Sequence, residues 1–592
     1  MIFGKYINRY YLKYAPWLLL GLIALIAVDY LQLLTPRLYQ MVINGMNDGY
    51  VMFEGAKTVF DMDFLLEHIC MPMVFIIIFI CFGRFLWRIC IFGAAIKVET
   101  ELRNAMFGHA RHLSAQYYQV NKVGNLMSLF TNDLETVQEC YGSGFLMLFD
   151  ALFLGLMAIM KMWGMDPLLT CFALVPMALL LAGSTIVGKQ LGKKWRARQA
   201  AFSSLSDFSQ ESFSGISVIK AFVKESRELL AFKKLNRENE AANVDFTRTA
   251  TLFRILVMLF VESVVCVILG YGGYLVWKGD FNAGQLVEFI GYFTTIVWPI
   301  MAVSELIDLT SRGKASLGRI SELLDAGVDV KDADGVKELQ NPKGDIEFRK
   351  LSFRYPEGEY DVLKDVSFSV KAGENVGLVG KTGSGKTTIV DLILRTYNVP
   401  DGCLFIDGQD VNSLSIRSVR DACAYVPQDN FLFSDTIENN ISFGVDDPNH
   451  GAVTEAAILA DVDGNIQGFS QGYETVLGER GVTVSGGQKQ RISIARALMR
   501  DAAILILDDS VSAVDTATEK AILENLRRTR RGRSTILIAH RISTIEKMDK
   551  IIFIEDGHVE AIGTHGELYA SCPAYRKMVE LQRLEEEGGL DR

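Results

Sequence analysis

Residues 374–393 read ENVGLVGKTGSGKTTIVDLI. This stretch combines an apolar strand, a glycine-rich turn and the start of a helix, and its centre, 380–387, matches G-x-x-x-x-G-K-S/T at every fixed position. Glycines let backbone N–H groups wrap around phosphate groups, and the positive end of the following helix adds to the attraction. The stretch therefore predicts an α/β domain with a phosphate-binding loop.

Two side chains of this loop have specific tasks in such a site. Lys386 is expected to reach the β and γ phosphates of a nucleoside triphosphate, and the Thr387 hydroxyl is expected to ligate Mg²⁺. The predicted cradle as a whole consists of Gly380, Lys381, Thr382, Gly383, Ser384, Gly385, Lys386, Thr387 and Thr388.

A second apolar strand ends in two carboxylates. Residues 502–510 read AAILILDDS, so that Asp508 and Asp509 follow a run of apolar residues. Carboxylates at a strand end suit a Mg²⁺ ion held opposite a phosphate loop. The alternative is a pair of unrelated buried strands with polar ends. Because both elements stand in the right order, we predict that the chain binds ATP with Mg²⁺.

The half of the chain before residue 325 has a different texture. At 592 residues the chain is too long for one compact core, and residues 15–310 contain long apolar stretches. Taking about 20 apolar residues as one transmembrane helix, we predict six spans, near 16–44, 68–96, 140–163, 166–188, 250–277 and 284–306. The predicted fold is an all-α six-helix transmembrane domain at 1–325, a linker at 326–343 and an α/β nucleotide-binding domain at 344–592.

The distribution of basic residues predicts the orientation in the membrane. Lys and Arg gather in the segments after the second and fourth spans, for example at Lys97, Arg103, Lys193 and Lys194. Such positive charge marks cytoplasmic loops. We therefore expect a multi-pass protein of the cell membrane whose N-terminus, C-terminus and nucleotide-binding domain are all cytoplasmic.

Overall charge and cysteine usage argue against other classes of function. The net charge is −10, the pI is near 5.4, and Lys and Arg are outnumbered by Asp and Glu, so a nucleic-acid partner is not expected. The nine cysteines are scattered and never form a C-x-x-C pair, so neither a disulfide nor a zinc site is expected.

Five ionisable residues lie inside the predicted spans: Asp29, Arg84, Arg88, Asp150 and Glu262. A charge near the bilayer centre is costly unless it is paired or faces water, so these side chains should point into the helix bundle or a cavity. Structural and functional roles are both open for each of them. If the acidic residues face a cavity, they predict a preference for cationic amphipathic compounds.

A third motif identifies a family. Residues 482–498 read VTVSGGQKQRISIARAL and strongly resemble the L-S-G-G-Q signature of ATP-binding cassette proteins, with Val484 in place of the leading Leu. Six spans followed by one cassette is the half-exporter layout of this family, and the chain looks most like bacterial multidrug-type exporters. Further family motifs stand around the signature in order: Tyr355 in FRYP, Gln428 in YVPQDNFLF, Glu479 in TVLGERG, SAVD at 512–515 and His540 in LIAHR.

The resemblance implies roles for residues around the nucleotide. Tyr355 should stack on adenine, and His540 should contact the γ phosphate and help to position the attacking water. Gln428 should sense Mg²⁺ and complete its ligand set with Thr387 and Asp508.

The resemblance also implies contacts with a second chain and between domains. The signature residues should cap ATP that is bound to the other cassette; they are Ser485, Gly486, Gly487 and Gln488. Two cytoplasmic turns, 120–137 and 212–225, look like the coupling helices that press on the ATPase, and the alternative is a pair of ordinary loops.

One residue departs from the family pattern. The position after the Mg²⁺-binding aspartate is normally Glu, whose carboxylate polarises the attacking water, and here it is Asp509. Because this side chain is one methylene shorter, we expect the chain's own site to bind ATP and to hydrolyse it slowly. The resemblance therefore favours a heterodimer with a second half-transporter that carries Glu at this position. The alternative is a homodimer in which Asp509 works well enough.

These observations predict ATP-driven export of amphipathic compounds, of multidrug or lipid type, by an ATPase coupled to transport. Two alternatives stay open: a regulatory ATP-binding membrane protein that does not transport, and an exporter of one dedicated lipid or peptide. The predicted partners are the second half-transporter, the amphipathic or lipid substrate and the membrane lipids. The sequence does not identify the substrate, because it does not locate the residues that line the transport cavity.

Overall fold

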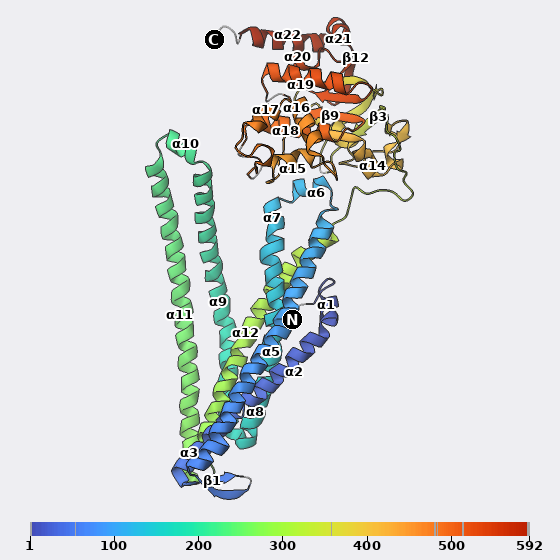
Figure 1. The fold of residues 1–592 in the computed structure, drawn as a ribbon. Helices are drawn as coiled ribbons and strands as arrows, with labels where there is room; N and C mark the ends of the chain where they lie inside the picture. Colours follow the sequence, from blue (N-terminus) through green and yellow to red (C-terminus); the bar gives the residue numbers. More distant parts are fainter. Residues whose placement is uncertain are drawn as a thin grey trace. The chain divides into compact units, whose positions relative to one another are not determined.

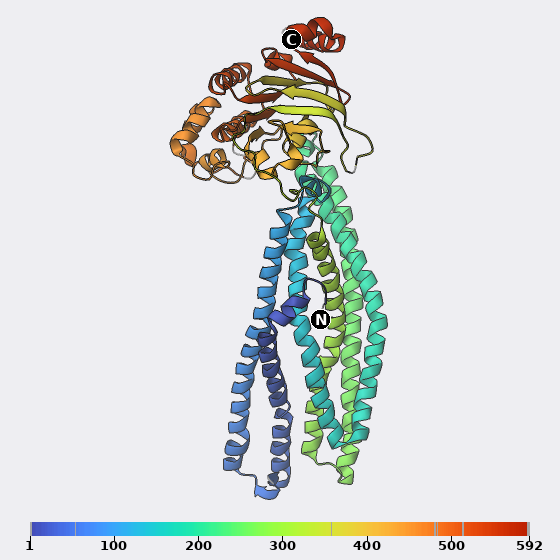
Figure 2. The ribbon, with the colours of Figure 1, turned by 90° about the vertical axis from the view of Figure 1, so that its right-hand side faces the viewer.

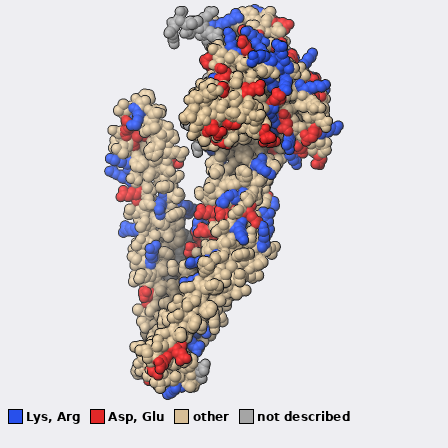
Figure 3. All heavy atoms as spheres, in the orientation of Figure 1, with Lys and Arg blue, Asp and Glu red and all other residues tan. Residues whose placement is uncertain are grey.

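The computed structural model describes residues 3–53, 55–356, 358–478, 481, 484–511 and 514–588. Two compact units make up the chain (Figure 1). Unit 1 consists of Met1–Arg111 and Val123–Ala326, and unit 2 consists of His112–Lys122 and Gly327–Arg592. Charged side chains are sparse over the long helices of unit 1 and crowd on the surface of unit 2 (Figure 3).

Unit 1 is helical apart from one hairpin. The hairpin pairs β1 (Tyr50–Phe53) with β2 (Ala56–Val59) in antiparallel register. The helices are α1 Asn8–Lys13, α2 Ala15–Gln32, α3 Thr35–Asp48, α4 Met62–Leu65, α5 Met71–Ala110, α7 Val123–Ser128, α8 Leu134–Met165, α9 Pro167–Ser214, α10 Ile216–Ala221, α11 Glu225–Lys278 and α12 Ala283–Asp325, with π-helical turns η1 Leu66–Cys70 and η2 Leu129–Asp133.

Five helical segments of the described chain are long and apolar enough to cross a membrane. They are Ala15–Asp48, Met62–Ala110, Val123–Met165, Glu225–Lys278 and Ala283–Asp325. The predicted span at 166–188 falls on α9, whose described apolar part is the shorter segment Pro167–Leu179. Five of the six predicted spans thus coincide with such segments, and the count of six stays a prediction.

The first predicted span is not one continuous helix. We expected a helix over 16–44, but α2 ends at Gln32 and α3 begins at Thr35. Pro36 lies in the first turn of α3 and has no N–H to donate to the carbonyl of Gln32, and its ring would clash with that carbonyl in a continuous helix. The break therefore follows from the proline.

The helices of unit 1 pack in pairs: α8 along α12, α2 along α5, and α9 along α11. Small residues permit the close approach of α2 and α5. A Cβ atom at Gly83 would lie 2.5 Å from a methyl carbon of Val28, and one at Gly21 would lie 2.8 Å from Ile91. The helices α9 and α11 run beside each other, and α10 joins them at one end (Figure 1, Figure 2).

Unit 2 contains two sheets and a set of shorter helices. The six-stranded sheet has the order β12-β11-β5-β10-β9-β8, and the four-stranded sheet has the order β4-β3-β6-β7. The strands are β3 Ile346–Phe353, β4 Leu363–Val370, β5 Asn375–Val379, β6 Leu404–Ile406, β7 Gln409–Asp410, β8 Cys423–Val426, β9 Ile504–Asp508, β10 Ser534–Ile538, β11 Lys550–Glu555 and β12 His558–Gly563. The helices are α6 Ala115–Val120, α13 Lys386–Ile393, α14 Ile416–Asp421, α15 Ile437–Ser442, α16 His450–Leu459, α17 Asp463–Gln467, α18 Gly486–Met499, α19 Thr516–Thr529, α20 Ile542–Ile545, α21 His565–Ser571 and α22 Pro573–Gly588, with 3₁₀ turns η3 Val411–Ser413 and η4 Gly472–Glu474.

The six-stranded sheet is buried on both faces. Every residue of β9 and of β10 is buried, which is why both sequences are continuous apolar runs. Alternate residues enter different cores: Leu505 and Leu507 pack in one, and Ile504 and Ile506 pack in the other. The two cores hold the central strands in fixed register.

The first predicted coupling turn, 120–137, forms α7, η2 and the start of α8. A further short helix, α6 (Ala115–Val120), directly precedes it, and the coupling role stays a prediction. Within unit 2, the Tyr397 hydroxyl donates a hydrogen bond of 2.9 Å to Oε1 of Gln119 on α6. The second predicted turn, 212–225, contains α10.

Candidate nucleotide-binding site

Four parallel strands end at the same edge of the six-stranded sheet. Ile538 of β10 pairs with Leu378 of β5 on one side and with Asp508 of β9 on the other. On the far side of β9, Leu507 pairs with Val426 of β8. The loops after these strands carry the predicted phosphate loop, His540, Asp509 and Gln428, so the sheet topology brings these segments together. Ligands of open α/β sheets bind at this edge.

The phosphate loop needs glycine at specific positions. Gly383 and Gly385 have φ angles of +83° and +99°, in the left-handed region that favours glycine. A Cβ atom at Gly385 would also lie 2.6 Å from a methyl carbon of Leu363, and one at Gly380 would collide with the carbonyl oxygen of Ile554. The loop then runs directly into α13, whose first-turn N–H groups have no partner within the helix.

Lys386 is fixed inside this loop. Its side chain is 6% exposed, and its Nζ donates hydrogen bonds of 2.9 Å to the Gly380 carbonyl and 2.8 Å to the Lys381 carbonyl. Burial lowers the pKa of Lys386, and the nearby Asp508 and Asp509 oppose this shift. The buried hydroxyl of Ser384 has no hydrogen-bond partner. Phosphate oxygens would supply acceptors for both groups.

Asp508 faces the same loop from the end of β9. It is 2% exposed, and its carboxylate is hydrogen-bonded to the side chain of Thr387. The pKa of Asp508 is raised, mainly by burial and further by the negative charge of Asp509. The hydrogen bond with Thr387 and the nearby Lys386 and His540 oppose this increase. The Oδ2 atom is buried and accepts no hydrogen bond. An unsatisfied carboxylate oxygen beside a threonine hydroxyl fits the donor set of a Mg²⁺ ion.

The backbone of Asp509 is held from both sides. Its φ is +46°, in the left-handed region, which Asp adopts more readily than most residues. Its N–H donates to the Ile538 carbonyl at 3.0 Å, and its carbonyl accepts from Nε2 of Gln490 at 3.2 Å. These contacts resist the backbone shift that would compensate for a shorter side chain.

Gln490 was missed by the sequence analysis. It lies on α18, two residues after the signature, and it is buried. Its hydrogen bond to Asp509 ties the signature helix to the turn after β9. The available signal was a polar residue among the apolar positions of this helix, but the sequence did not say what it would contact.

A second missed residue is Asp391, four residues after Thr387 on α13. It is half-buried, and burial together with the charge of Asp508 raises its pKa to about 6, although a hydrogen bond with Thr396 opposes the shift. A carboxylate inside the apolar run IVDLI was the signal that could have identified it.

We expect Asp391→Asn to stabilise the protein at pH 8 and to have less effect at pH 5. The folded-state pKa lies about two units above the ordinary value, so ionisation costs at most about 3 kcal/mol once the pH exceeds about 6. This cost disappears as the pH falls towards the unfolded pKa near 4. Melting temperatures of the wild-type protein and of Asp391→Asn, measured between pH 5 and pH 8 without nucleotide or Mg²⁺, check this prediction. A difference that does not depend on pH would mean that the substitution acts through lost contacts.

Tyr355 lies beside the end of the phosphate loop. Its hydroxyl is 2.9 Å from Oγ1 of Thr388, and its ring meets the rings of Phe353 and Tyr397 edge to face, with centroids 5.1 Å and 5.0 Å apart. Burial raises its pKa. The ring is thus held close to the loop, and stacking on adenine stays a prediction.

The signature residues form the beginning of α18. Ser485 caps the helix: its hydroxyl accepts from the Gln488 N–H at 3.3 Å, and Oε1 of Gln488 accepts from the Ser485 N–H at 2.9 Å. Ser485 and Gly486 are exposed, and Gly487 and Gln488 are partly so. Val484 packs in the core below, so Val at this position preserves the apolar contact expected of Leu. The helix N-terminus therefore faces outward, where a ligand on another chain can reach it.

The other predicted site residues are Gln428, His540, Glu479 and those of the SAVD motif. Gln428 is exposed just after β8, and His540 is half-buried, with its carbonyl accepting from Nε2 of Gln582 at 2.6 Å. Glu479 and the first two residues of the SAVD motif lie outside the described residues.

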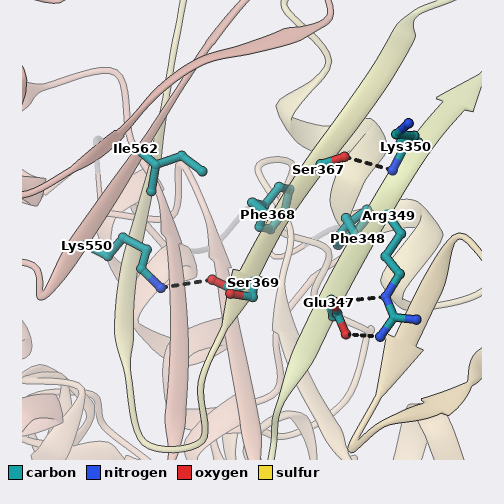
Figure 4. A pocket seen from close by; sticks show the side chains of 9 residues that line it. All are labelled: Glu347, Phe348, Arg349, Lys350, Ser367, Phe368, Ser369, Lys550 and Ile562. Atoms are coloured by element: carbon teal, nitrogen blue, oxygen red, sulfur yellow. Dashed lines mark hydrogen bonds and ion pairs between the residues drawn. The ribbon is translucent and has the colours of Figure 1, made fainter.

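A separate hollow of about 660 Å³ lies over β3, β4, β11 and β12 (Figure 4). Several of its polar groups already have partners: Arg349 donates two hydrogen bonds to Glu347, and Lys550 donates to the Ser369 carbonyl at 2.9 Å. None of its lining residues belongs to the phosphate loop. We therefore place nucleotide chemistry at the strand edge and not in this hollow.

Known proteins resemble both parts of the chain. Residues 18–300 match the ABC transporter transmembrane region, and residues 363–512 match the ABC transporter family. A probable multidrug resistance ABC transporter ATP-binding/permease protein of Bacillus subtilis, YheI, is 36% identical over 590 residues, which cover 99% of this chain and 98% of that protein. The multidrug resistance-like ATP-binding protein MdlA of Escherichia coli is 35% identical over 568 residues, covering 96% and 94%. The structure of a bacterial Atm1-family ABC exporter with ATP bound matches with a TM-score of 0.77 at 25% identity, covering 97% of this chain and 99% of that one.

Proposed function

The chain belongs to the ABC transporter family, and from this premise we propose that it is the slowly hydrolysing half of a heterodimeric exporter of amphipathic compounds. It is a bacterial multidrug-type half-exporter in which a helical membrane domain is fused to an ATPase, and it couples ATP hydrolysis to transport. The names of both relatives refer to multidrug resistance. They support multidrug-type substrates for this chain, and lipid-type substrates belong to the proposal on the basis of the sequence resemblance alone.

The residues at the edge of the six-stranded sheet are proposed to bind ATP and its Mg²⁺ ion. The cradle binds the phosphates and Lys386 neutralises them. Thr387 and Asp508 would hold Mg²⁺, with Gln428 at the end of β8 as the third expected ligand, and the bound ion would supply screening of the negative charge of the phosphates. The support for this assignment is the buried, unsatisfied Oδ2 of Asp508 beside Thr387. His540 lies at the same edge and serves to position the attacking water.

The membrane part is proposed to cross the bilayer six times. The apolar segment Pro167–Leu179 supports a span within α9, which is 48 residues long. An even number of spans leaves both termini and the ATPase on one side. The Lys and Arg bias after the second and fourth spans makes that side the cytoplasm.

The observation that carries the heterodimer is the contrast between Asp509 and the signature. The general base position holds the shorter acid, and the backbone hydrogen bonds with Ile538 and Gln490 oppose a shift that would bring its carboxylate forward. The signature, in contrast, is capped and exposed, ready to complete an ATP site on another chain. A homodimer would use this intact signature on two weakened sites.

The apolar surface around α10 also supports a partner chain. Ile216, Val218, Phe222 and Val223 are all exposed although they lie far from the apolar stretches of the spans. Contiguous exposed apolar groups on a cytoplasmic segment are typical of a contact surface. The cassette of the second half-transporter is the proposed occupant, with α10 as a coupling helix.

Purification of the chain alone and together with a half-transporter that carries Glu at the position of Asp509 tests the proposal. We expect little ATPase activity from the chain alone, robust activity from the pair, and a loss of about a hundredfold when the catalytic Glu of the partner is changed to Gln. Transport of an amphipathic dye into inverted vesicles separates an exporter from a regulatory protein. Robust activity of the chain alone, or full activity after the partner's Glu→Gln change, contradicts the heterodimer.

A further inference from the structure

Four helices of unit 1, α2, α5, α8 and α12, surround a cavity of about 440 Å³. Each belongs to a candidate membrane span. At 1.5 Å per residue, the cavity lies roughly 20 Å from the first residue of α5 and from the last residue of α8, which is deep within a hydrocarbon core about 30 Å thick. Polar groups at this depth are costly unless they serve a function or find partners.

The cavity collects four of the five charged residues predicted inside the spans. They are Asp29, Arg84, Arg88 and Asp150. Glu262, which we had grouped with the other acids, lies on α11 and does not line the cavity. The acidic residues therefore do not act as one set, and those that meet in the cavity share it with an equal number of arginines.

The two carboxyl groups lie together on one side of the cavity. Asp29 is 2% exposed, and its Oδ2 atom is buried without a hydrogen-bond partner. A side-chain hydrogen bond joins Asp29 and Asp150, and Oδ2 of Asp150 accepts a second one of 2.8 Å from Nε1 of Trp298. The two carboxyl groups share one proton in this hydrogen bond, and the negative charge that the pair keeps is not balanced by one indole N–H. This side of the cavity is therefore suited to a positively charged donor.

The arginines and a second indole offer donors in the same cavity. Arg84 has a long hydrogen bond of 3.5 Å to Oε1 of Gln32, and the guanidinium of Arg88 lies over the ring of Trp87, 5.4 Å from its centroid. Nε1 of Trp87 is buried without a partner. Among the residues that the structure describes, no ion pair within 4.0 Å joins either arginine to a carboxylate. An unpartnered indole N–H and two arginines without a described carboxylate within 4.0 Å thus lie in the same cavity as the unpartnered Oδ2 of Asp29.

We propose that this cavity binds the zwitterionic head group of an amphipathic molecule, with its ammonium against Asp29 and Asp150 and its anionic group against Arg84 and Arg88. A simple cation would leave both arginines without an anionic partner, whereas a zwitterion carries one group that pairs with the carboxyl groups and one that pairs with the arginines. The apolar lining, which includes Leu25, Leu146 and Leu154, accommodates the adjoining hydrophobic part. This inference rests on the proposed export function, for which it names the substrate class, and it replaces our expectation of a preference for cations.

Two sources could supply such a head group, a zwitterionic drug or a zwitterionic phospholipid. The first arm of the test uses equilibrium dialysis of the full-length transporter, without ATP, against norfloxacin, which carries an ammonium and a carboxylate. Its methyl ester keeps only the cation, and its N-acetyl derivative keeps only the anion. The second arm measures, by native mass spectrometry, whether phosphatidylethanolamine is retained in nanodiscs made of phosphatidylglycerol.

We expect the zwitterion of at least one arm to bind about tenfold or more tightly than its singly charged counterparts, as the loss of one charge-assisted contact implies. Asp29→Asn with Asp150→Asn should remove this preference, and so should Arg84→Gln with Arg88→Gln. Glu262→Gln and Arg254→Gln make the same chemical changes on α11, outside the cavity lining, and should leave binding unchanged. A single symmetric peak in size-exclusion chromatography and an unchanged helical circular dichroism spectrum confirm that each variant is folded.

Three results would overturn the proposal. The first is equal affinity for the ester and for norfloxacin together with no selective retention of phosphatidylethanolamine. The second is no binding in either arm, and the third is a preference for the zwitterion that survives both double substitutions. None of these depends on ATP hydrolysis. A failure here with intact ATP-driven dye transport would reject the zwitterion site alone, and a failure of the proposed export function would appear in the transport and ATPase measurements instead.

Discussion

Lys386→Ala should weaken ATP binding at this chain's own site by about a hundredfold or more. The Nζ group is buried in the loop and already directed at two carbonyl oxygens, so phosphate oxygens can replace these acceptors without a large movement of the side chain. Each charge-assisted hydrogen bond to a phosphate contributes about 1.5–3 kcal/mol, so loss of contacts with two phosphates accounts for this factor. No other side chain of the loop brings a full positive charge into its interior, because Lys381 turns outward to Glu555 at 2.6 Å.

A photo-crosslinkable ATP analogue, followed by separation of the two chains, measures occupancy of this site separately from that of the partner. Lys364→Ala removes an exposed lysine of the same unit and should leave labelling unchanged. Labelling of this chain that persists at wild-type level after Lys386→Ala would reject the assignment of the loop.

Local motifs explain why the sequence predicted much of the nucleotide site. The phosphate loop depends on glycines at fixed spacing, and the acids after an apolar strand depend on neighbouring residues only. The contacts that fix Asp509 are different. They come from β10 and α18, which lie 29 and 19 residues away along the chain at Ile538 and Gln490, and only the folded sheet brings them together.

The membrane domain was predictable as helices but not as a site. Apolar length located most of the spans, and the proline at position 36 marked a break that we did not anticipate. Which charged residues share a cavity depends on helix rotation and pairing. Asp29 and Asp150 meet although 121 positions separate them, while Glu262 faces elsewhere. A weak amphipathic pattern in long apolar helices does not specify these faces.

Asp509→Glu should raise the ATPase activity of the isolated chain by about tenfold or more. Restoring the missing methylene brings the carboxylate forward by about 1 Å, a displacement that can change the rate of a general base by about a hundredfold, or about 2.7 kcal/mol. The left-handed backbone at this position opposes part of the gain, because Glu tolerates it less well than Asp at a cost of about 1 kcal/mol. The gain exceeds the cost, so the net change is an acceleration.

Steady-state phosphate release from the purified chain measures this effect, with ATP affinity as the check that binding is unaltered. Asp509→Asn keeps the size of the side chain and removes its charge, and it should abolish the slow basal hydrolysis if the carboxylate acts on water. In the complex with the partner, Asp509→Glu should change total turnover far less, because the site completed by this chain's signature already hydrolyses ATP. If Asp509→Glu failed to accelerate the isolated chain while Asp509→Asn left basal hydrolysis intact, the slow step would lie elsewhere and the asymmetry between the two sites would need a cause other than this carboxylate.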